Sequence, residues 1–146
     1  MCTVALQFKA HMNGISDLAT LLATLAPVLD PECYVFVSRP TAVYGDGVEL
    51  EPIASVAEVE GLTLIVRKEM ANASGDTYDG EFRRIGLTVH SDLHAVGLTA
   101  AIATAFSQEG ISANVVAGFY HDHIFVPAER SADAMIVLSQ LADQNQ

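Results

Sequence analysis

The sequence predicts an α+β protein built from two similar modules, each an antiparallel sheet covered by helices on one face. Two observations carry this prediction. The order strand, helix, strand, strand occurs in each half of the chain, and a polar stretch separates the halves. The chain has 146 residues, of which 51% are hydrophobic and 17% charged. This composition suits one domain or two small modules and excludes a disordered chain.

The first half opens with a predicted strand and helix. Residues 3–8 are rich in β-forming side chains and predict the strand. Ser16 can cap the following helix, in which leucines recur at helical spacing over residues 18–25. Pro27 and Pro31 predict that the helix has ended before them.

Two further strands complete the first half. Residues 33–37 and 62–66 are short apolar runs, as in buried strands. The connection between them contains the turn-forming residues 44–47, Tyr-Gly-Asp-Gly. A short helical turn is expected over residues 69–73.

A polar stretch at residues 72–80 combines turn-forming residues with no apolar periodicity. Such a stretch is typical of a linker. We therefore expect a first module over residues 1–75 and a second over residues 81–146.

The second half repeats the order of elements. Residues 82–90 alternate in polarity and predict a long strand. A helix is expected over residues 95–109, where apolar side chains recur at helical spacing, and Gly110 suits its left-handed cap. Residues 114–120 and 124–126 predict two more strands.

These last strands flank a predicted hairpin turn at residues 120–123, and Pro127 can open a final helix. The order βαββα, with right-handed crossovers, leads to a ferredoxin-like sandwich. A full copy of that fold needs a closing strand, and two copies need more strands than the sequence shows. We therefore expect residues 82–90 to serve both modules, or one module to lend an edge strand to the other.

The charge of the chain excludes several partners. Seven Lys and Arg residues against 18 Asp and Glu residues give a net charge of −11, which repels phosphate backbones and anionic lipid headgroups. No nucleic acid or membrane partner is expected. Cys2 and Cys33 form no CxxC pair, and the first nine residues lack the features of a secretory signal, so a cytoplasmic location is expected.

The second module gathers polar side chains at one end of its predicted sheet. In a ferredoxin-like module the third strand lies between the first and second, so the end of the first strand and the hairpin share an edge. Four of the five histidines fall there. The cluster comprises His90, Asp92, His94, His121, Asp122 and His123.

This edge offers hydrogen-bond donors for an anionic group and acceptors for a cationic group of a small ligand. The helix start after Asp92 and Gly97 offers unpaired N–H groups to a carboxylate, and Gly97 permits close approach. Asp92 or Asp122 can accept from an ammonium group, and Asn114 can donate and accept. The alternative is structural: Gly97 permits helix packing and Asp92 caps the helix. The predicted ligand-binding residues are Asp92, His94, Ala95, Val96, Gly97, Leu98, Asn114, Tyr120, His121, Asp122 and His123.

The same cluster leaves two other interpretations open. Imidazole and carboxylate groups together suit zinc, nickel or ferrous iron, and histidine near neutral pH can act as acid or base in a small enzyme. No nucleophile and base stand at a diagnostic spacing, and Cys33 lies in an apolar strand, typical of a core residue. We therefore expect no catalytic residue, no metal and no cofactor.

Residues 91–99, SDLHAVGLT, and 110–127, GISANVVAGFYHDHIFVP, resemble the ACT-domain family. More narrowly, the chain resembles small bacterial stand-alone proteins with two ACT-like modules, and residues 34–36 and 60–64 show a looser similarity. The resemblance implies two ferredoxin-like regulatory modules that bind amino acids or other small ligands where two modules meet. The generic signature has Pro-Gly before a leucine, whereas Gly97 here follows a longer loop without that proline.

We therefore expect a non-catalytic regulatory or sensor protein that binds a small molecule, an amino acid. Its sheets have edge strands and a face that needs cover, so we also expect a homodimer. The loop of the first module that corresponds to the second module's site is expected at residues 11–14.

Overall fold

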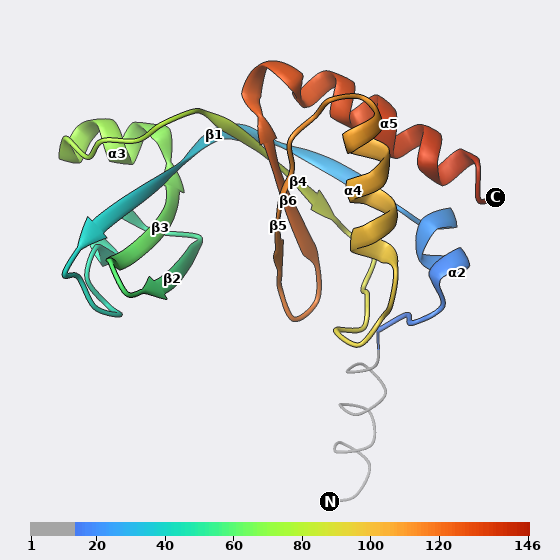
Figure 1. The fold of residues 1–146 in the computed structure, drawn as a ribbon, viewed down its shortest axis with the longest axis horizontal. Coiled ribbons are helices and arrows are strands. Elements are labelled where there is room, and N and C mark those ends of the chain that lie inside the picture. The colour runs from blue at the N-terminus through green and yellow to red at the C-terminus, as the bar shows by residue number, and fades with distance from the viewer. Residues whose placement is uncertain (1–13) are drawn as a thin grey trace, which may run out of the picture. The chain divides into compact units, whose positions relative to one another are not determined.

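The computed structural model describes residues 14–146, which form two compact units (Figure 1). One unit contains residues 30–84, and the other combines the described residues up to Leu29 with residues 85–146. The division passes through two strands, β1 (Pro27–Pro40) and β4 (Phe82–Leu87), so each strand contributes residues to both units. The sequential modules 1–75 and 81–146 follow a different division and stay a prediction.

In the 30–84 unit the strand order is β2-β3-β1, with β4 beside β1. Strands β2 (Ala54–Glu58) and β3 (Gly61–Arg67) pair antiparallel, as do β1 and β3. The short 3-10 helix η1 (Val48–Leu50) and helix α3 (Lys68–Ser74) cover one face. The buried core on this face comprises Val35, Val37, Leu50, Leu62, Leu64, Val66 and Ala71.

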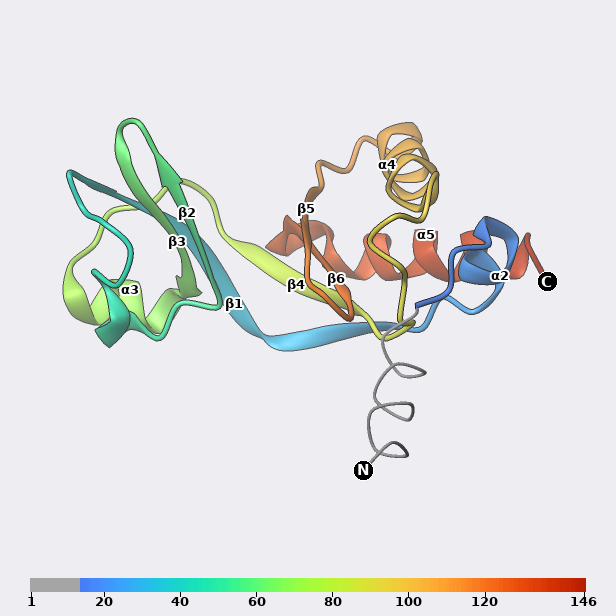
Figure 2. The ribbon, with the colours of Figure 1, turned by 90° about the horizontal axis from the view of Figure 1, so that it is seen from below.

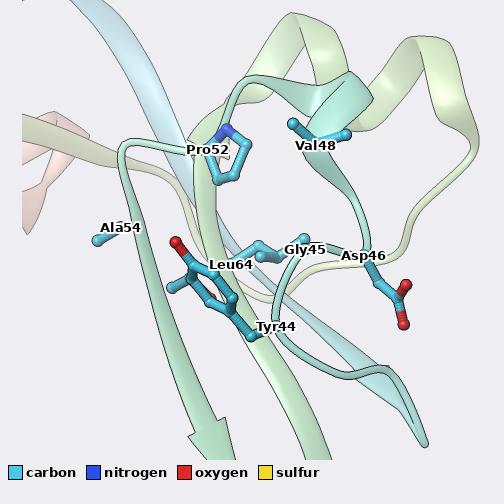
Figure 3. Close-up of a pocket in the computed structure, with 8 residues that line it drawn as sticks. Tyr44, Gly45, Asp46, Val48, Pro52, Ala54 and Leu64 are labelled. Carbon is cyan, nitrogen blue, oxygen red and sulfur yellow. The ribbon is translucent and has the colours of Figure 1, made fainter.

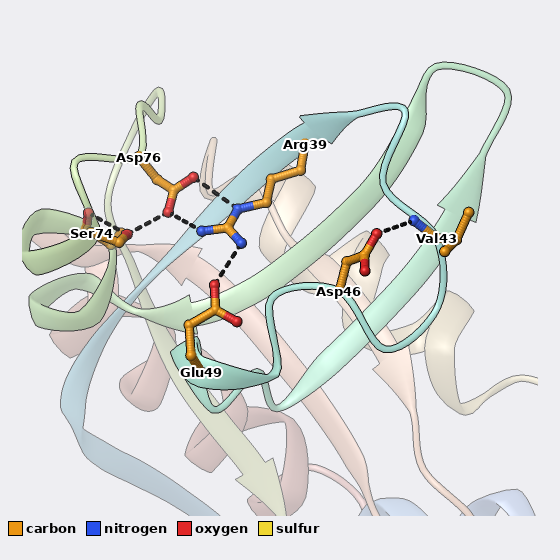
Figure 4. A network of polar contacts seen from close by, with 7 residues as sticks. Arg39, Val43, Asp46, Glu49, Ser74 and Asp76 are labelled. Carbon is orange, nitrogen blue, oxygen red and sulfur yellow. Dashed lines mark hydrogen bonds and ion pairs between the residues drawn. The ribbon is translucent and has the colours of Figure 1, made fainter.

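An ion-pair network ties the ends of these elements together (Figure 4). The guanidinium of Arg39, near the end of β1, donates to both carboxylate oxygens of Asp76 at 3.1 and 2.7 Å. It also donates to Glu49 of η1 at 2.8 Å. Ser74, the last residue of α3, donates to Asp76 as well. One arginine therefore fixes the loop after α3 and the short helix η1 to the same strand.

In the other unit the strand order is β4-β6-β5, with β1 beside β4. Its strands β5 (Asn114–Ala117) and β6 (Asp122–Pro127) form an antiparallel hairpin. Helices α2 (Leu18–Ala23), α4 (Leu98–Gln108) and α5 (Ser131–Asp143) pack on one face of this sheet, as Figures 1 and 2 show. The core includes Ile85, Leu87 and Val89 after the unit boundary, Ile124 and Val126 of β6, Phe106 of α4 and Leu138 of α5.

Strands β1 and β4 are shared, and in each unit one of them acts as the closing strand that the sequence pattern lacks. In the 30–84 unit, β4 lies beside β1, and the guanidinium of Arg83 donates to the carbonyl oxygen of Asp30 in β1 at 2.6 Å. In the other unit, the N–H of Thr88 donates to the carbonyl oxygen of Ala26 at 3.1 Å. Each unit thereby has the strand order of a ferredoxin-like sheet. The predicted α+β fold of two ferredoxin-like modules is confirmed.

Several boundaries differ from the predicted ones. Asp17, not Ser16, caps α2, because its Oδ2 accepts from the N–H of Thr20 at 2.9 Å. Strand β1 begins at Pro27 and contains Pro31, so the prolines that follow the helix belong to the next strand. The strand predicted at residues 3–8 lies outside the described residues.

The second half also shifts by a few residues. Helix α4 begins three residues later than predicted, because Gly97 before it has a left-handed backbone (φ 103°). The hairpin turn falls at residues 118–121, where the N–H of Gly118 donates to the carbonyl oxygen of His121 at 2.9 Å. After β6, the 3-10 helix η2 (Ala128–Arg130) precedes α5. Across residues 14–146, no helix combines the length and apolar character needed to cross a membrane.

Candidate functional site

The loop after β4 is held in place by residues that are distant in sequence. Ile15 forms a parallel bridge with Ser91. Its N–H donates to His90 at 2.8 Å, and its carbonyl oxygen accepts from the N–H of Asp92 at 2.9 Å. Gly14 lies so close that a Cβ there would be 2.5 Å from the backbone nitrogen of Asp92. The loop therefore leaves the sheet in a fixed direction.

This loop, the start of α4 and the hairpin of β5 and β6 line an open cavity of about 90 Å³. The hydroxyl of Ser91, which is 7% exposed, donates to Oδ2 of Asp122 at 2.9 Å, and both residues line the cavity. Residues 90–92 and 118–122 are thus in contact, as the strand order predicts. The lining residues are Ser91, Asp92, Leu93, Ala95, Leu98, Thr99, Ala117 and Asp122.

The start of helix α4 supplies hydrogen-bond donors to this cavity. The first turn of a helix has N–H groups without intrahelical partners, and no side chain caps α4, because Gly97 occupies the cap position. Leu98 and Thr99 line the cavity, so their backbone N–H groups and the Thr99 hydroxyl are the available donors. A helix start of this kind favours an anionic group such as a carboxylate.

Two carboxylates, those of Asp92 and Asp122, line the same cavity as these donors. The contacts within residues 14–146 use Oδ1 of Asp92, which accepts from the N–H of His94 at 2.7 Å, and Oδ2 of Asp122. Each carboxylate retains a second oxygen that can accept from an ammonium group. The cavity therefore combines donors for an anion with acceptors for a cation.

The structure brings together four of the predicted ligand-binding residues, namely Asp92, Ala95, Leu98 and Asp122. Gly97 precedes α4 and would contact Leu18 at 2.8 Å if it carried a Cβ. The sequence reasoning missed Ser91, Leu93, Thr99 and Ala117. The strand-end rule that identified Asp92 also applies to Ser91, its neighbour, whereas nothing in the sequence distinguishes the other three.

Three predicted residues lie away from the cavity lining. His94 and Val96 are exposed, and only the backbone of His94 contacts Asp92. Asn114 pairs with Phe125, whereas Ala117, which lines the cavity, pairs with Asp122. Three residues along a strand correspond to about 10 Å. These three positions stay predictions without a contact to the cavity.

The rings of His90, His121 and His123 do not line the cavity. The ring of His90 lies 5.1 Å from that of Tyr120, measured between centroids, and Tyr120 also contacts Phe119 at 5.0 Å. His121 Nδ1 lies 3.4 Å from the carbonyl oxygen of Val89. His123 follows Asp122 in β6, so its side chain points to the other face of the sheet, beside Gly86.

Within the described residues, no three His, Cys, Asp or Glu side chains are arranged to hold a metal ion. The predicted cluster therefore has no metal-binding geometry in this part of the chain. Burial raises the pKa of the Cys33 thiol, and Glu81 nearby raises it further. A thiol in this environment is a weaker nucleophile at neutral pH. Cys33 is half-buried and lies outside the core of the 30–84 unit, so the predicted core position is not what the structure shows.

Comparisons with known proteins agree on the two modules. ACT-domain family models match residues 13–83 and 81–140. A solved Vibrio cholerae protein of unknown function, described as a possible transport protein, shares 46% identity with a TM-score of 0.78. That match covers 86% of this chain and 95% of the Vibrio chain. The comparison with curated proteins found no match.

More distant structures share the fold. A protein of Agrobacterium tumefaciens has 12% identity and a TM-score of 0.68, covering 81% of this chain and 89% of its own. The regulatory subunit of aspartate kinase from Thermus thermophilus, in its ligand-free form, has 11% identity and a TM-score of 0.56. That match covers 81% of this chain and 98% of the subunit. At these identities the likeness establishes the fold alone.

Proposed function

Because the chain belongs to the ACT-domain family, we propose that it is a regulatory protein that binds a small ligand in the cavity at the start of α4. The single observation that carries this proposal is that the start of α4, which no side chain caps, lines the same cavity as the carboxylates of Asp92 and Asp122. The likeness to a regulatory subunit of aspartate kinase supports the regulatory part. We propose a binding role rather than catalysis, because the chain matches ACT-domain models and shares its fold with a regulatory subunit.

The ligand that suits this cavity is an amino acid. Its carboxylate is placed at the N–H groups of Leu98 and Thr99, and its ammonium group at the free oxygens of Asp92 and Asp122. The cavity of about 90 Å³ is well below the range of about 300–1,000 Å³ that is typical of sites for drug-sized ligands. A small amino acid therefore fits better than a large one.

A screen of the amino acids by thermal shift tests this proposal. A ligand that binds only the folded state raises the free energy of unfolding by about 2.7 kcal/mol at 100 times its Kd. We expect one or a few small amino acids to raise the melting temperature, and the recovered ligand to be chemically unchanged by NMR. If no amino acid raises it at concentrations of about 10 mM, the ligand class is wrong.

Two variants locate the site. Asp92→Asn and Asp122→Asn each remove a negative charge while keeping an oxygen that accepts from His94 or Ser91, so the fold is preserved. We expect each to weaken amino-acid binding by about tenfold or more, as loss of a charged hydrogen bond does. The matched control is Asp79→Asn, because Asp79 is exposed and lies in the other unit. Equal effects at all three positions would contradict the assignment.

We also propose that the protein forms a homodimer in the cytoplasm. Strands β2 and β5 stand at the two ends of the strand order, so each has an unpaired edge. Val56 of β2 is 51% exposed at such an edge, which supports pairing with a second copy. Light scattering at protein concentrations of tens of micromolar tests the dimer, and a monomeric mass would exclude it at that concentration.

A further inference from the structure

The 30–84 unit contains a second cavity, of about 320 Å³, that the sequence analysis did not foresee (Figure 3). It lies between the connection that follows β1 and the strands β2 and β3. Its volume falls in the range of about 300–1,000 Å³ found for small-molecule sites. The lining residues are Tyr44, Gly45, Asp46, Val48, Pro52, Ala54, Ser55 and Leu64.

The cavity exists because this unit has a reduced first helix. In the other unit, the connection after its first strand contains α4, a helix of 11 residues. The corresponding connection here contains only η1, with three residues. Ser55 pairs with Leu64, so both lie on the helix-covered face of the sheet, near the edge that η1 leaves open. Leu64, which is 1% exposed, forms the floor.

The loop is held close to this floor. Gly47 has a left-handed backbone (φ 78°), and a Cβ there would lie 2.5 Å from Cδ1 of Leu64. Asp46 accepts the N–H of Val43 at 2.8 Å, which closes the turn. These contacts fix the loop in place, so that it forms one wall of the cavity. The Asp46 carboxylate points away from the Tyr44 ring in Figure 3 and stands at the rim.

The charges around the cavity disfavour an anion. Of its lining residues, only Asp46 and Tyr44 can ionise. The two nearby arginines are each held by two carboxylates, Arg39 by Glu49 and Asp76 and Arg67 by Glu51 and Glu69. No lining group offers a positive charge to a ligand carboxylate or phosphate, so an anion would lose its hydration without a charged partner.

We propose that this cavity binds a small organic ammonium ion with a compact apolar body. Tyr44 is 89% exposed and presents an aromatic face, which attracts ammonium groups, and the Ser55 hydroxyl can accept from the same group. The apolar side chains of Val48, Pro52 and Leu64 contact the body of the ligand. The class of ligand is therefore an amine without a carboxylate, unlike the amino acid proposed for the cavity at α4.

A matched pair of probes tests the ligand class. 3-Methylbutylammonium and L-leucine share the same branched apolar body and differ in the carboxylate. In ¹H–¹⁵N spectra of the full chain, we expect the amine to shift the amide signals of residues 44–55 in a saturable way. L-Leucine should bind there at least about tenfold more weakly. Absence of saturable shifts with the amine, or equal binding of the two probes at these residues, overturns the proposal.

Variants confine the test to this cavity. Ser55→Leu fills the space above Leu64 and should abolish the shifts, whereas Ser107→Leu, the same change at an exposed position of α4, should leave them intact. Tyr44→Phe keeps the aromatic face and should retain binding, while Tyr44→Ala should weaken it by about fivefold or more. Unchanged amine binding in both Ser55→Leu and Tyr44→Ala would also overturn the proposal. Signals of residues 91–99 report the other cavity, so the two proposals fail independently.

Discussion

The hydroxyl of Ser91 donates a hydrogen bond to Oδ2 of Asp122 at 2.9 Å, which joins the loop after β4 to the first residue of β6. Ser91 is one of two buried polar residues among those described, the other being Ser131. Both residues line the cavity at α4, and the bond fixes the Oδ2 oxygen of Asp122. Ser91 therefore acts on the candidate site through Asp122.

The change Ser91→Ala tests this link. A neutral donor to a charged acceptor that is partly buried contributes about 1–2 kcal/mol, so we expect the free energy of unfolding to fall by that amount. Urea denaturation measures it. Ser107→Ala, on the exposed side of α4, is the control and should change the value by less than about 0.5 kcal/mol. Equal changes in the two variants would mean that the Ser91 bond contributes nothing to stability.

Gly14 is required by the close approach of two segments, and Gly14→Ala tests that requirement. An added Cβ would lie 2.5 Å from both the nitrogen of Asp92 and the carbonyl carbon of Ser91, which are backbone atoms that cannot rotate away. We expect a loss of about 1–3 kcal/mol in the free energy of unfolding, as for other overpacked positions. Thermal or urea unfolding measures it.

The control for this prediction is Gly86→Ala. A Cβ at Gly86 meets no atom closer than 3.9 Å, and the residue lies inside strand β4. Alanine restricts the unfolded chain more than glycine does, so the variant should be as stable as the parent or more stable by up to about 1 kcal/mol. If Gly14→Ala behaves in the same way, the segment of Gly14 does not pack as described.

Local patterns were sufficient to predict most elements of the fold. Helices α4 and α5 and strand β3 have clear periodicity or continuous apolar runs, and each was predicted within a few residues. Strand β2 was missed because four of its five positions are exposed, so it has no alternating pattern. The start of β1 was missed because prolines usually interrupt regular structure. The count of strands did predict that the modules share a strand, but the sharing of β1 as well as β4 depends on long-range pairing, which no local pattern encodes.

The candidate site was predicted only in part, because some of its contacts follow from strand order and others do not. Strand order placed Asp92 and Asp122 together, because both follow from which strands are neighbours. The support from Ile15 was not predictable, since a bridge between residues 15 and 91 depends on the path of the whole chain. Residues 11–14 were predicted to be the loop of the first module that corresponds to the second module's site. This segment ends at Gly14, which packs on Ser91. The connection after β1, which includes Tyr44, holds that position in the 30–84 unit.

The substitution Tyr34→Phe tests a polar contact in the shared strand β1. Its hydroxyl donates to Oδ2 of Asp30 at 2.9 Å, and the guanidinium of Arg84 lies 5.2 Å from the centre of its ring. Burial raises the pKa of Tyr34, so the neutral phenol remains the donor at neutral pH. We expect Tyr34→Phe to lower the free energy of unfolding by about 1–2 kcal/mol, because the ring stays and the donor is lost.

The control for Tyr34→Phe is the same substitution at Tyr44. Tyr34 is 3% exposed and Tyr44 is 89% exposed, so removing the Tyr44 hydroxyl leaves no buried group without a partner. The stability of Tyr44→Phe should therefore match that of the parent within about 0.5 kcal/mol. A loss at Tyr34 no larger than at Tyr44 would show that the bond to Asp30 is replaced by water at no cost.

The ion pair of Arg39 with Asp76 predicts how stability depends on pH. The Arg39 hydrogen bonds hold the pKa of Asp76 below its ordinary value of 3.8, against the opposing effect of burial. A carboxyl whose pKa is lower in the folded state stabilises the protein above the unfolded pKa, and this contribution is lost as the pH falls through the folded pKa. Stability from this pair is therefore complete above about pH 4–5 and disappears in more acidic solution.

The change Asp76→Asn removes this contribution at every pH. We expect the variant to be less stable than the parent by about 1.5–3 kcal/mol near pH 7, the range for hydrogen bonds to charged groups, with the difference shrinking below the ordinary pKa of 3.8. Urea denaturation at a series of pH values measures the difference. Asp79→Asn, at an exposed position of the same loop, should show almost none. A difference for Asp76→Asn that stays constant into acid would mean that the amide, not the lost charge, causes the destabilisation.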